Sequence, residues 1–195
     1  TASSVALPSL AGKYDIKIMG VLESACHEAL RLTKNNRIGV IGTSVTVKSG
    51  KYGEIIRGIS PKAEVFSNAC PMFVPLVENG YAESEAARLI AADYLAPLKE
   101  EGVDTLIMGC THYPLLEGVI SDIMGSGVKL VSPGAMAARS ARDYLAEQNA
   151  LCERTEGGKS EFYVSDSVEN FVELGSIFLG CPLDTKVRRT EAFSE

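Results

Sequence analysis

The feature that most constrains this chain is the alternation of short apolar runs with longer segments of helical periodicity. The apolar runs have the length and the β-branched content of buried strands. They lie at residues 17–21, 37–42, 63–67, 104–109, 129–131 and 161–164. The helical patterns lie at residues 24–33, 43–58 after a turn, 71–78, 84–99, 114–124, 135–148 and 168–179. This alternation predicts an α/β fold with mostly parallel sheets flanked by helices and joined by right-handed crossovers.

Local signals predict several element ends. Ser24 is expected to cap the first helix at its N-terminus. Pro97 is expected to kink or stop the long helix that contains it. The residues available for the buried face of that helix are Ala87, Leu89, Ile90, Tyr94 and Leu95. Gly180 is expected to close the last helix. Residues 151–160 are polar and contain glycine, so we expect an exposed loop there.

The charge balance excludes two classes of partner. The chain has 195 residues and a formal net charge of -6, whereas nucleic acids and anionic membranes require a positive surface. No apolar run approaches the roughly 20 residues that span a bilayer, and no segment has the pattern of a signal peptide. We therefore expect no nucleic-acid partner and no membrane partner.

The cysteines indicate a reducing compartment. They are odd in number and widely spaced, and no CxxC pair occurs, which argues against a disulfide framework. Only two histidines could join them, without paired-ligand spacing, so no metal site is predicted. A cytoplasmic location fits best. The five cysteines are Cys26, Cys70, Cys110, Cys152 and Cys181.

The richest chemistry follows the predicted strand at residues 104–109. Ligands of open parallel sheets bind at the carboxyl ends of the strands. There Cys110, Thr111 and His112 place a thiol, a hydroxyl and an imidazole side by side, before a helix that begins at Pro114. The free N–H groups of a helix N-terminus suit a carboxylate and favour a thiolate. The segment fits a reactive cysteine beside an anion site, or equally a buried cysteine with a capping threonine and a hydrogen-bonded histidine.

Weaker candidates follow other strands. Thr43 and Thr46 lie in a strand-to-helix turn, where hydroxyls either bind a carboxylate or phosphate or cap their own helix. Glu78 is either a carboxylate aimed at the site or a solvated helix end, and spacing does not decide between them. Cys70, before a proline in an apolar stretch, is interpreted as structural. The local glycines complete no dinucleotide-binding or P-loop motif, so nucleotide binding is unsupported.

The segment at residues 109–116, GCTHYPLL, resembles the second catalytic motif of glutamate racemases. This eight-residue block is specific to the family, and the other matching segments fix the alignment along the rest of the chain. They are residues 38–43 with Thr46, residues 69–78, and residues 162–166 with residues 178–180. The resemblance thus covers nearly the whole chain.

The resemblance implies two similar α/β domains that face one cleft. Residues 23–131 would form the complete second domain, and residues 1–22 with 132–195 the remainder of an incomplete first domain. In the family the first catalytic cysteine lies in an Ala-Cys-Asn-Thr-Ala-Ser run, and the chain begins at the Thr of that run. We therefore expect the partner cysteine two residues upstream of Thr1.

The resemblance also implies an activity, namely the cofactor-independent racemisation of L- and D-glutamate. One thiol removes the α-proton and a second thiol delivers a proton to the opposite face, for which an ordinary thiol pKa of about 8.5 is suitable near neutral pH. The product D-glutamate would supply peptidoglycan synthesis in a bacterial cytoplasm. A homodimer is compatible with the family.

Residue roles follow from the same resemblance. Cys110 would be one of the two thiols, His112 would tune it, and Glu78 would assist electrostatically. The substrate contacts would come from Thr1, Thr111 and His112, with Thr43 and Thr46 as second-rank candidates. No cofactor and no metal are expected.

Three other functions fit parts of the pattern. An aspartate racemase would use the same motif, although His112 after Cys-Thr favours glutamate. A cysteine hydrolase would use Cys110 with His112, whose side chains must bend to meet. A binding module for small acids would need neither residue for catalysis.

Overall fold

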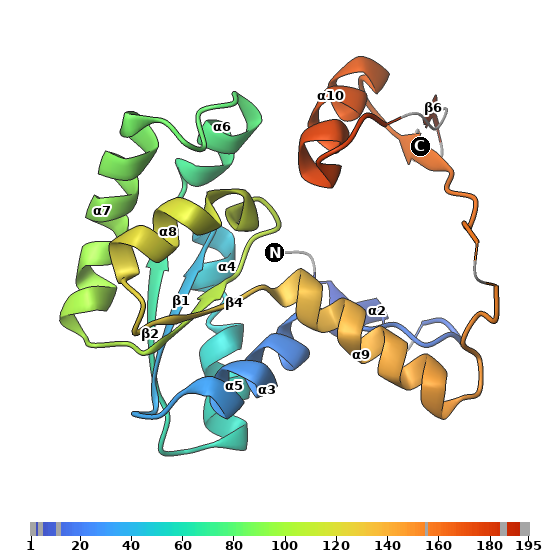
Figure 1. Ribbon diagram of the computed structural model, residues 1–195. Helices are drawn as coiled ribbons and strands as arrows, with labels where there is room; N and C mark the ends of the chain where they lie inside the picture. Colours follow the sequence, from blue (N-terminus) through green and yellow to red (C-terminus); the bar gives the residue numbers. More distant parts are fainter. Residues whose placement is uncertain (1–2, 4–5, 11–12, 155, 184–186, 192–195) are drawn as a thin grey trace. The chain divides into compact units, whose positions relative to one another are not determined.

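The computed structural model describes residues 3, 6–10, 13–154, 156–183 and 187–191 (Figure 1). The chain forms two compact units, Thr1–Leu151 and Cys152–Glu195. Thr1, predicted to contact substrate, lies outside the described residues. Among the described helices, none combines the length and apolarity needed to cross a bilayer.

The first unit is built on a four-stranded parallel sheet in the order β2-β1-β3-β4. Its strands are β1 (Arg37–Gly42), β2 (Glu64–Ala69), β3 (Thr105–Met108) and β4 (Lys129–Val131). The register pairs Ile41 with Met108 and Gly42 with Ala69. The carboxyl ends of β1, β2 and β3 therefore lie side by side.

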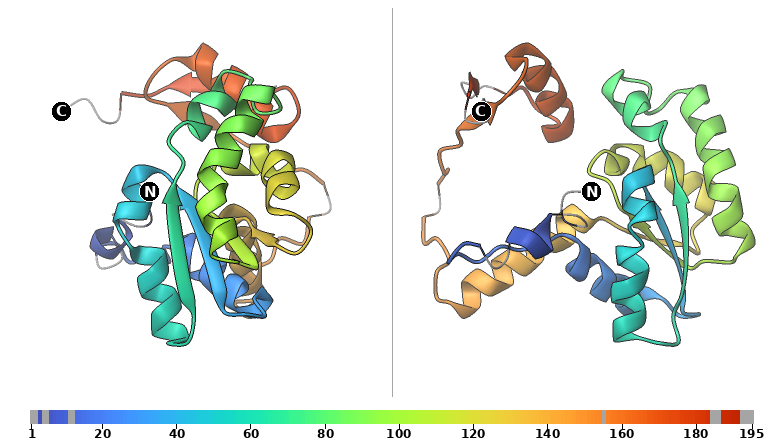
Figure 2. Two further views of the ribbon diagram at one scale, coloured as in Figure 1. Left: turned by 90° about the vertical axis from the view of Figure 1, so that its left-hand side faces the viewer. Right: turned by 180° about the vertical axis from the view of Figure 1, so that it is seen from behind.

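Helices cover both faces of this sheet (Figure 2). One layer contains α6 (Phe73–Glu78), α7 (Glu85–Glu100), the 3-10 turn η1 (Tyr113–Leu116) and α8 (Glu117–Met124). The other contains α3 (Leu22–Leu32) and α5 (Lys51–Ile59), and α9 (Pro133–Glu147) packs on α3. The short helices α2 (Leu7–Leu10) and α4 (Ser44–Lys48) complete the unit.

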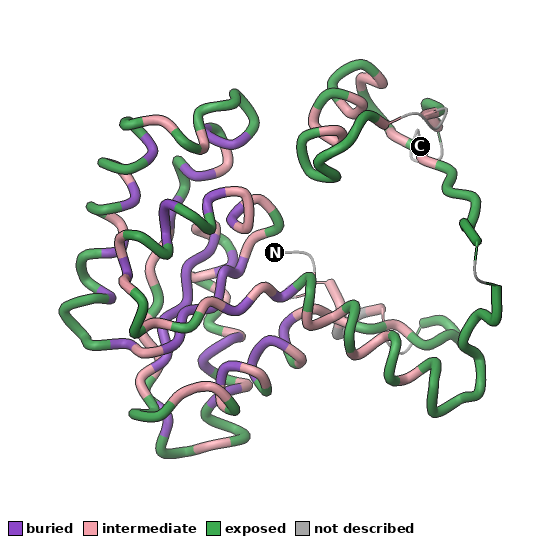
Figure 3. Tube along the Cα trace, in the orientation of Figure 1, coloured by how far each residue is buried: buried purple, intermediate pink, exposed green. Residues whose placement is uncertain are grey.

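The alternation of side chains along the strands divides the core into two clusters. Ile41 and Leu106 point into the cluster under α7 and α8, whereas Val40 and Ile107 point into the cluster under α3 and α5. All four are buried on a sheet covered on both faces, which explains the continuous apolar runs of β1 and β3. Figure 3 shows buried segments running through this sheet and the helices that cover it.

The second unit is a β-α-β unit formed by β5 (Phe162–Val164), α10 (Val168–Leu179) and β6 (Val187–Arg189), whose two strands pair in parallel. The Ser167 side chain accepts a hydrogen bond from the Asn170 amide at the start of α10. Gly180 ends α10 at φ 65°, as predicted. No described residue of this unit is buried (Figure 3).

The structure confirms the α/β class and corrects several predicted elements. The predicted strand at residues 17–21 is wrong: residues 17–20 have no regular structure, and no described strand pairs with them. Helix α3 begins at Leu22, so Ser24 lies inside it and does not cap it. The helix starts earlier than predicted because its first residue, Leu22, is buried in the core. Gly50, at φ 64°, divides the predicted helix within residues 43–58 into α4 and α5.

For the helix at residues 84–99, a stop at Pro97 and a buried Leu89 are both wrong, whereas Ala87 and Leu95 are buried as predicted. The helix passes through Pro97 and ends at Glu100, because a proline in the last turn removes one hydrogen bond close to the helix end. Leu89 is 65% exposed. It lies about half a turn away from the buried stripe of Ala87, Ala91 and Leu95.

Candidate active site

Glycines allow the closest approach at the ends of β1 and β3. The Gly109 amide donates to the Ile41 carbonyl over 2.7 Å, continuing the β1–β3 pairing past the end of β3. A Cβ added at Gly109 would lie 2.7 Å from the same Ile41 oxygen, so a side chain there would collide with backbone. The chain then turns, since the Tyr113 amide donates to the Cys110 carbonyl. Cys110 is thereby placed, half-buried, at the carboxyl edge of the sheet.

Cys110 begins a short chain of polar contacts. Its Sγ lies 3.9 Å from Nδ1 of His112, and Nε2 of His112 lies 3.0 Å from Oε1 of Glu78. The Thr111 hydroxyl is also 3.3 Å from Nδ1 of His112. The side chains of His112 and Glu78 are 20% and 41% exposed. Thiol, imidazole and carboxylate are thus connected at a surface that a solute can reach.

Packing beneath the surface brings Glu78 and His112 together. The Tyr113 hydroxyl donates to the Cys70 carbonyl over 2.9 Å, which ties η1 to the turn between β2 and α6. The Phe73 ring meets the Tyr113 ring edge to face, with centroids 5.1 Å apart. Glu78 ends the helix that Phe73 begins, so these buried contacts fix the distance between its carboxylate and His112.

The contacts define what the imidazole can do. When the proton of a neutral His112 lies on Nε2, it is donated to Glu78, and Nδ1 is left as an acceptor facing Cys110 and Thr111. A protonated His112 would be stabilised by the Glu78 carboxylate and would favour a Cys110 thiolate. The arrangement can therefore move a proton between sulfur and imidazole, as general acid–base chemistry requires.

Thr43 and Thr46 lie at the adjoining end of β1. Their hydroxyl oxygens are 3.0 Å apart, and the Thr46 amide donates to the Thr43 hydroxyl, which caps α4. Thr46 is buried, and its side chain lies against Gly42. Thr43 therefore caps its own helix, which is one of the two roles considered from the sequence. A contact with substrate remains a prediction for both residues.

The two buried cysteines differ from the half-buried Cys110. Cys26 and Cys70 are fully buried. Burial, with a smaller contribution from Glu23, raises the pKa of Cys26 to about 12. Burial alone raises the pKa of Cys70 to about 12. These thiols remain protonated near neutral pH, in agreement with the structural interpretation of Cys70.

Two buried tyrosines that the sequence did not single out flank the Cys110 turn. Tyr113 follows the cysteine closely in the chain, so its position next to the motif could have identified it. Tyr52 comes from α5, and its ring lies against Gly109. No sequence spacing connects Tyr52 to the motif, and only the fold brings them together.

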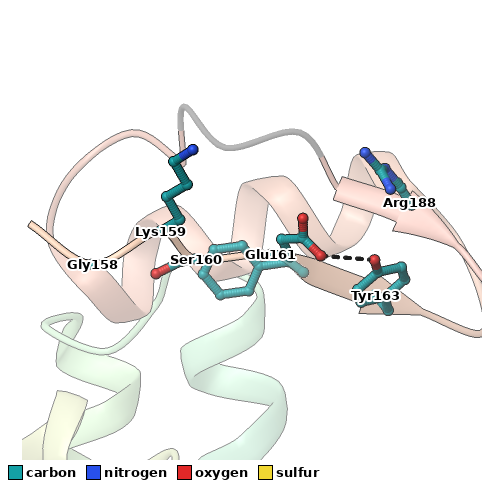
Figure 4. A pocket seen from close by; sticks show the side chains of 7 residues that line it. Gly158, Lys159, Ser160, Glu161, Tyr163 and Arg188 are labelled. Carbon is teal, nitrogen blue, oxygen red and sulfur yellow. Dashed lines mark hydrogen bonds between the residues drawn. The ribbon is translucent and has the colours of Figure 1, made fainter.

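The second unit carries a separate cavity of about 360 Å³ (Figure 4). It is lined by residues 158–163 and Arg188, and the Tyr163 hydroxyl donates to Glu161 over 3.0 Å. None of the predicted site residues contributes to it. Among the described residues, no three His, Cys, Asp or Glu side chains gather closely enough to hold a metal ion.

Comparison with known proteins identifies the family of this chain. Residues 1–141 match the model of the Asp/Glu/Hydantoin racemase family. The chain is 43% identical over 180 residues to the glutamate racemase of Geobacter metallireducens, an alignment that covers 92% of this chain and 67% of that protein. A second relative, glutamate racemase 2 of Caldanaerobacter subterraneus, is also 43% identical, with 65% of its length covered. The chain thus spans about two thirds of the length of these relatives.

Solved structures give the same result. Glutamate racemase isoform RacE1 from Bacillus anthracis superposes with a TM-score of 0.91 at 30% identity, over 98% of this chain and 71% of that one. The Francisella tularensis glutamate racemase in complex with D-glutamate superposes with a TM-score of 0.88 at 28% identity, over 100% and 72%. The resemblance predicted from the GCTHYPLL block is confirmed, and the chain belongs to the Asp/Glu/Hydantoin racemase family.

Proposed function

We propose that this chain acts in the racemisation of glutamate, with Cys110 as the acid/base on one face of the substrate Cα. The observation that carries the proposal is the chain of contacts from Cys110 Sγ through His112 to Glu78 at the carboxyl edge of the sheet. The names of the relatives favour glutamate as the substrate.

The proposed reaction is a proton exchange without a cofactor. The Cys110 thiolate takes the α-proton of one enantiomer and becomes a thiol. A second thiol gives its proton to the opposite face of the planar carbanion, which inverts the centre. In the reverse direction Cys110 is the donor. The second thiol is the one that the family resemblance implies, and no residue is assigned to it here.

The remaining residues hold the substrate or tune the thiol. His112 takes up or returns the proton of Cys110, and Glu78 stabilises the imidazolium that results. Thr111 contacts the substrate carboxylate, as Thr1 would by its motif position. Thr43 and Thr46 contribute from the neighbouring strand end.

The wider role follows from the product. D-glutamate made in a bacterial cytoplasm would enter peptidoglycan synthesis. A homodimer remains a prediction. The division of the family fold into residues 23–131 and a first-domain remainder formed by residues 1–22 and 132–195 also belongs to the proposal.

The test is deuterium incorporation at Cα in heavy water, with L- and D-glutamate assayed separately by mass spectrometry and chiral chromatography. A single thiol returns deuterium to the face from which it took the proton. We therefore expect exchange into one enantiomer, with retention of configuration, and none with Cys110→Ser. Cys152→Ser, at an exposed cysteine, is the matched control and should exchange like the parent.

Several outcomes would contradict the proposal. No exchange with either enantiomer would remove Cys110 as the base, and inversion by this chain would place a second base within these residues. Faster exchange with aspartate would make aspartate the substrate. An acyl-thiol at Cys110 trapped from an ester would indicate a hydrolase. Glutamate binding without exchange, with the same affinity in the parent and in Cys110→Ser, would indicate a binding module.

A further inference from the structure

The corner between α4 and α5 places two side chains under the strand ends that carry the site. Gly50 takes a left-handed conformation, φ 64°, and thereby separates the two helices. Thr46, on the first helix, lies against Gly42 at the end of β1. Tyr52, on the second, lies against Gly109 at the end of β3. One corner of the chain thus supports both glycines.

The contact between Tyr52 and Gly109 is close. A Cβ added at Gly109 would lie 3.1 Å from Cε2 and 3.5 Å from the hydroxyl oxygen of Tyr52. Only 4% of Tyr52 is exposed, and the Cys26 thiol lies 3.9 Å from its backbone carbonyl as a donor. The buried ring therefore packs directly beneath the Gly109–Cys110 turn, and its hydroxyl lies next to Gly109.

We propose, resting on the function proposed above, that Tyr52 is a positioning residue for Cys110. Its ring supports the Gly109–Cys110 turn from within the core, and its hydroxyl stabilises the thiolate form of Cys110. The reaction would then depend on a residue outside the motif, from a helix on the opposite face of the sheet to α7 and α8.

The protonation of Tyr52 supports this role. Burial first, and then the neighbouring Cys26 and Cys110, raise the pKa of Tyr52 well above its ordinary range. The phenol therefore keeps its proton at neutral and moderately alkaline pH and remains a donor.

The other titratable groups around Cys110 are already engaged. His112 is 3.9 Å away and is held by Glu78. Tyr113 also interacts electrostatically with Cys110 and Cys70, and burial is the main cause of its raised pKa. The Tyr113 hydroxyl donates to the Cys70 carbonyl, so its proton is committed. Removing the Tyr52 hydroxyl therefore tests its effect on Cys110 while these contacts stay in place.

The test measures the rate at which iodoacetamide alkylates Cys110 between pH 5 and 10, read from the Cys110 peptide by mass spectrometry. Cys152 and Cys181 are exposed and are replaced by serine in all variants. Only the thiolate reacts. Tyr52→Phe should slow alkylation about three- to tenfold at neutral pH, because a tenfold change corresponds to one pH unit. At high pH, where the thiol is fully ionised, the rate should equal that of the parent.

Tyr81→Phe is the control, because it removes an exposed phenol outside the Cys110 turn and should leave the curve in place. Tyr52→Leu, which removes the ring, should also lower the rate at high pH. A Tyr52→Phe curve identical to the parent curve would overturn the proposal, as would equal shifts in both phenylalanine variants. The assay contains no glutamate, so a failure of the Cα exchange experiment would not alter its result.

Discussion

Residues 22–131 and residues 152–195 use the same pattern of parallel strands and helices but reach different degrees of burial. In the first region every residue of β3 is buried, because helices cover the sheet on both faces. In the second, β5 has no buried residue, and neither has α10. Periodicity therefore specifies an element, whereas a core requires a second layer on each face of the sheet.

The candidate chemistry lies in the better packed of these regions. Cys110, His112 and Glu78 are held by the buried contacts of Tyr113 and Phe73. General acid–base groups act only when their geometry is held within narrow limits. Only the first of the two regions therefore has the buried packing needed to hold a reacting group in place.

The largest expected effect separates the regions by activity. Cys110→Ser should lower Cα exchange on glutamate by about 10²- to 10⁴-fold, the usual contribution of a positioned acid or base. Cys181→Ser, at an exposed cysteine of the second unit, should change it less than about twofold. Initial rates of deuterium incorporation measure both. An equal loss of exchange rate in the two variants would show that the reaction does not depend specifically on Cys110 in the packed region.

Thiol labelling should show the next largest contrast. Burial raises the pKa of Cys26 to about 12, whereas the Arg154 side chain and backbone, which donate to the exposed sulfur, lower the pKa of Cys152. A pulse of iodoacetamide at pH 8 should therefore label Cys152 at least about a thousandfold faster than Cys26. Peptide mass spectrometry gives both rates, and the ratio should approach one in denaturant. A ratio near one under native conditions would contradict the burial of Cys26.

Large-to-small substitutions should rank the regions by stability. Phe73 is fully buried, with the Tyr94 and Tyr113 rings edge-on at 5.4 and 5.1 Å. Phe73→Ala should lower the free energy of unfolding by about 3–5 kcal/mol. Leu179→Ala, at a residue that is 56% exposed on α10, should cost less than about 1 kcal/mol. Urea unfolding followed by circular dichroism measures both, and similar costs would refute the ranking.

Much of the first region could be predicted from the sequence, because β1 and β3 are continuous apolar runs whose burial needs no long-range information. The run at residues 17–21 has similar character and forms no strand, since an apolar run becomes a strand only beside a partner. Leu89 fails for a related reason. Several apolar residues of its helix could face the core, and the packing of Ala87 and Ala91 decides which of them do.

The site was predictable where its residues are neighbours in the chain. Cys110, Thr111 and His112 are consecutive, so the contacts of His112 with the other two need only the local turn. Glu78 reaches His112 from a different helix, and its spacing could not distinguish that contact from a solvated end. Tyr52 was missed entirely, because the direction of its side chain depends on the corner at Gly50.

The smallest expected effect concerns a charged contact at the opposite edge of the sheet. Asp104 precedes β3, and its carboxylate accepts hydrogen bonds from the Thr33 hydroxyl and from the Lys34 and Asn35 amides at 2.6, 2.6 and 2.9 Å. Burial tends to raise the pKa of Asp104, but these hydrogen bonds together with one from Thr105 lower it overall. Asp104→Asn should therefore cost about 1 kcal/mol of stability at pH 7.

The pH dependence gives this effect its sign. Because the folded pKa of Asp104 lies below the unfolded value, its contribution is complete above the unfolded pKa of about 3.9 and is lost as the pH falls through the folded value. Urea midpoints of parent and Asp104→Asn should thus begin to converge as the pH falls below about 3.9 and continue to do so through the folded value. The matched control is Glu169, on the exposed helix α10. Hydrogen bonds from its own amide and from the Ser167 hydroxyl lower the pKa of its carboxyl. Glu169→Gln should follow the parent curve throughout, because solvent competes for every contact of an exposed carboxylate. A gap for Asp104→Asn that does not narrow at all as the pH falls below about 3.9 would mean that the Asp104 contacts act through packing and not through charge.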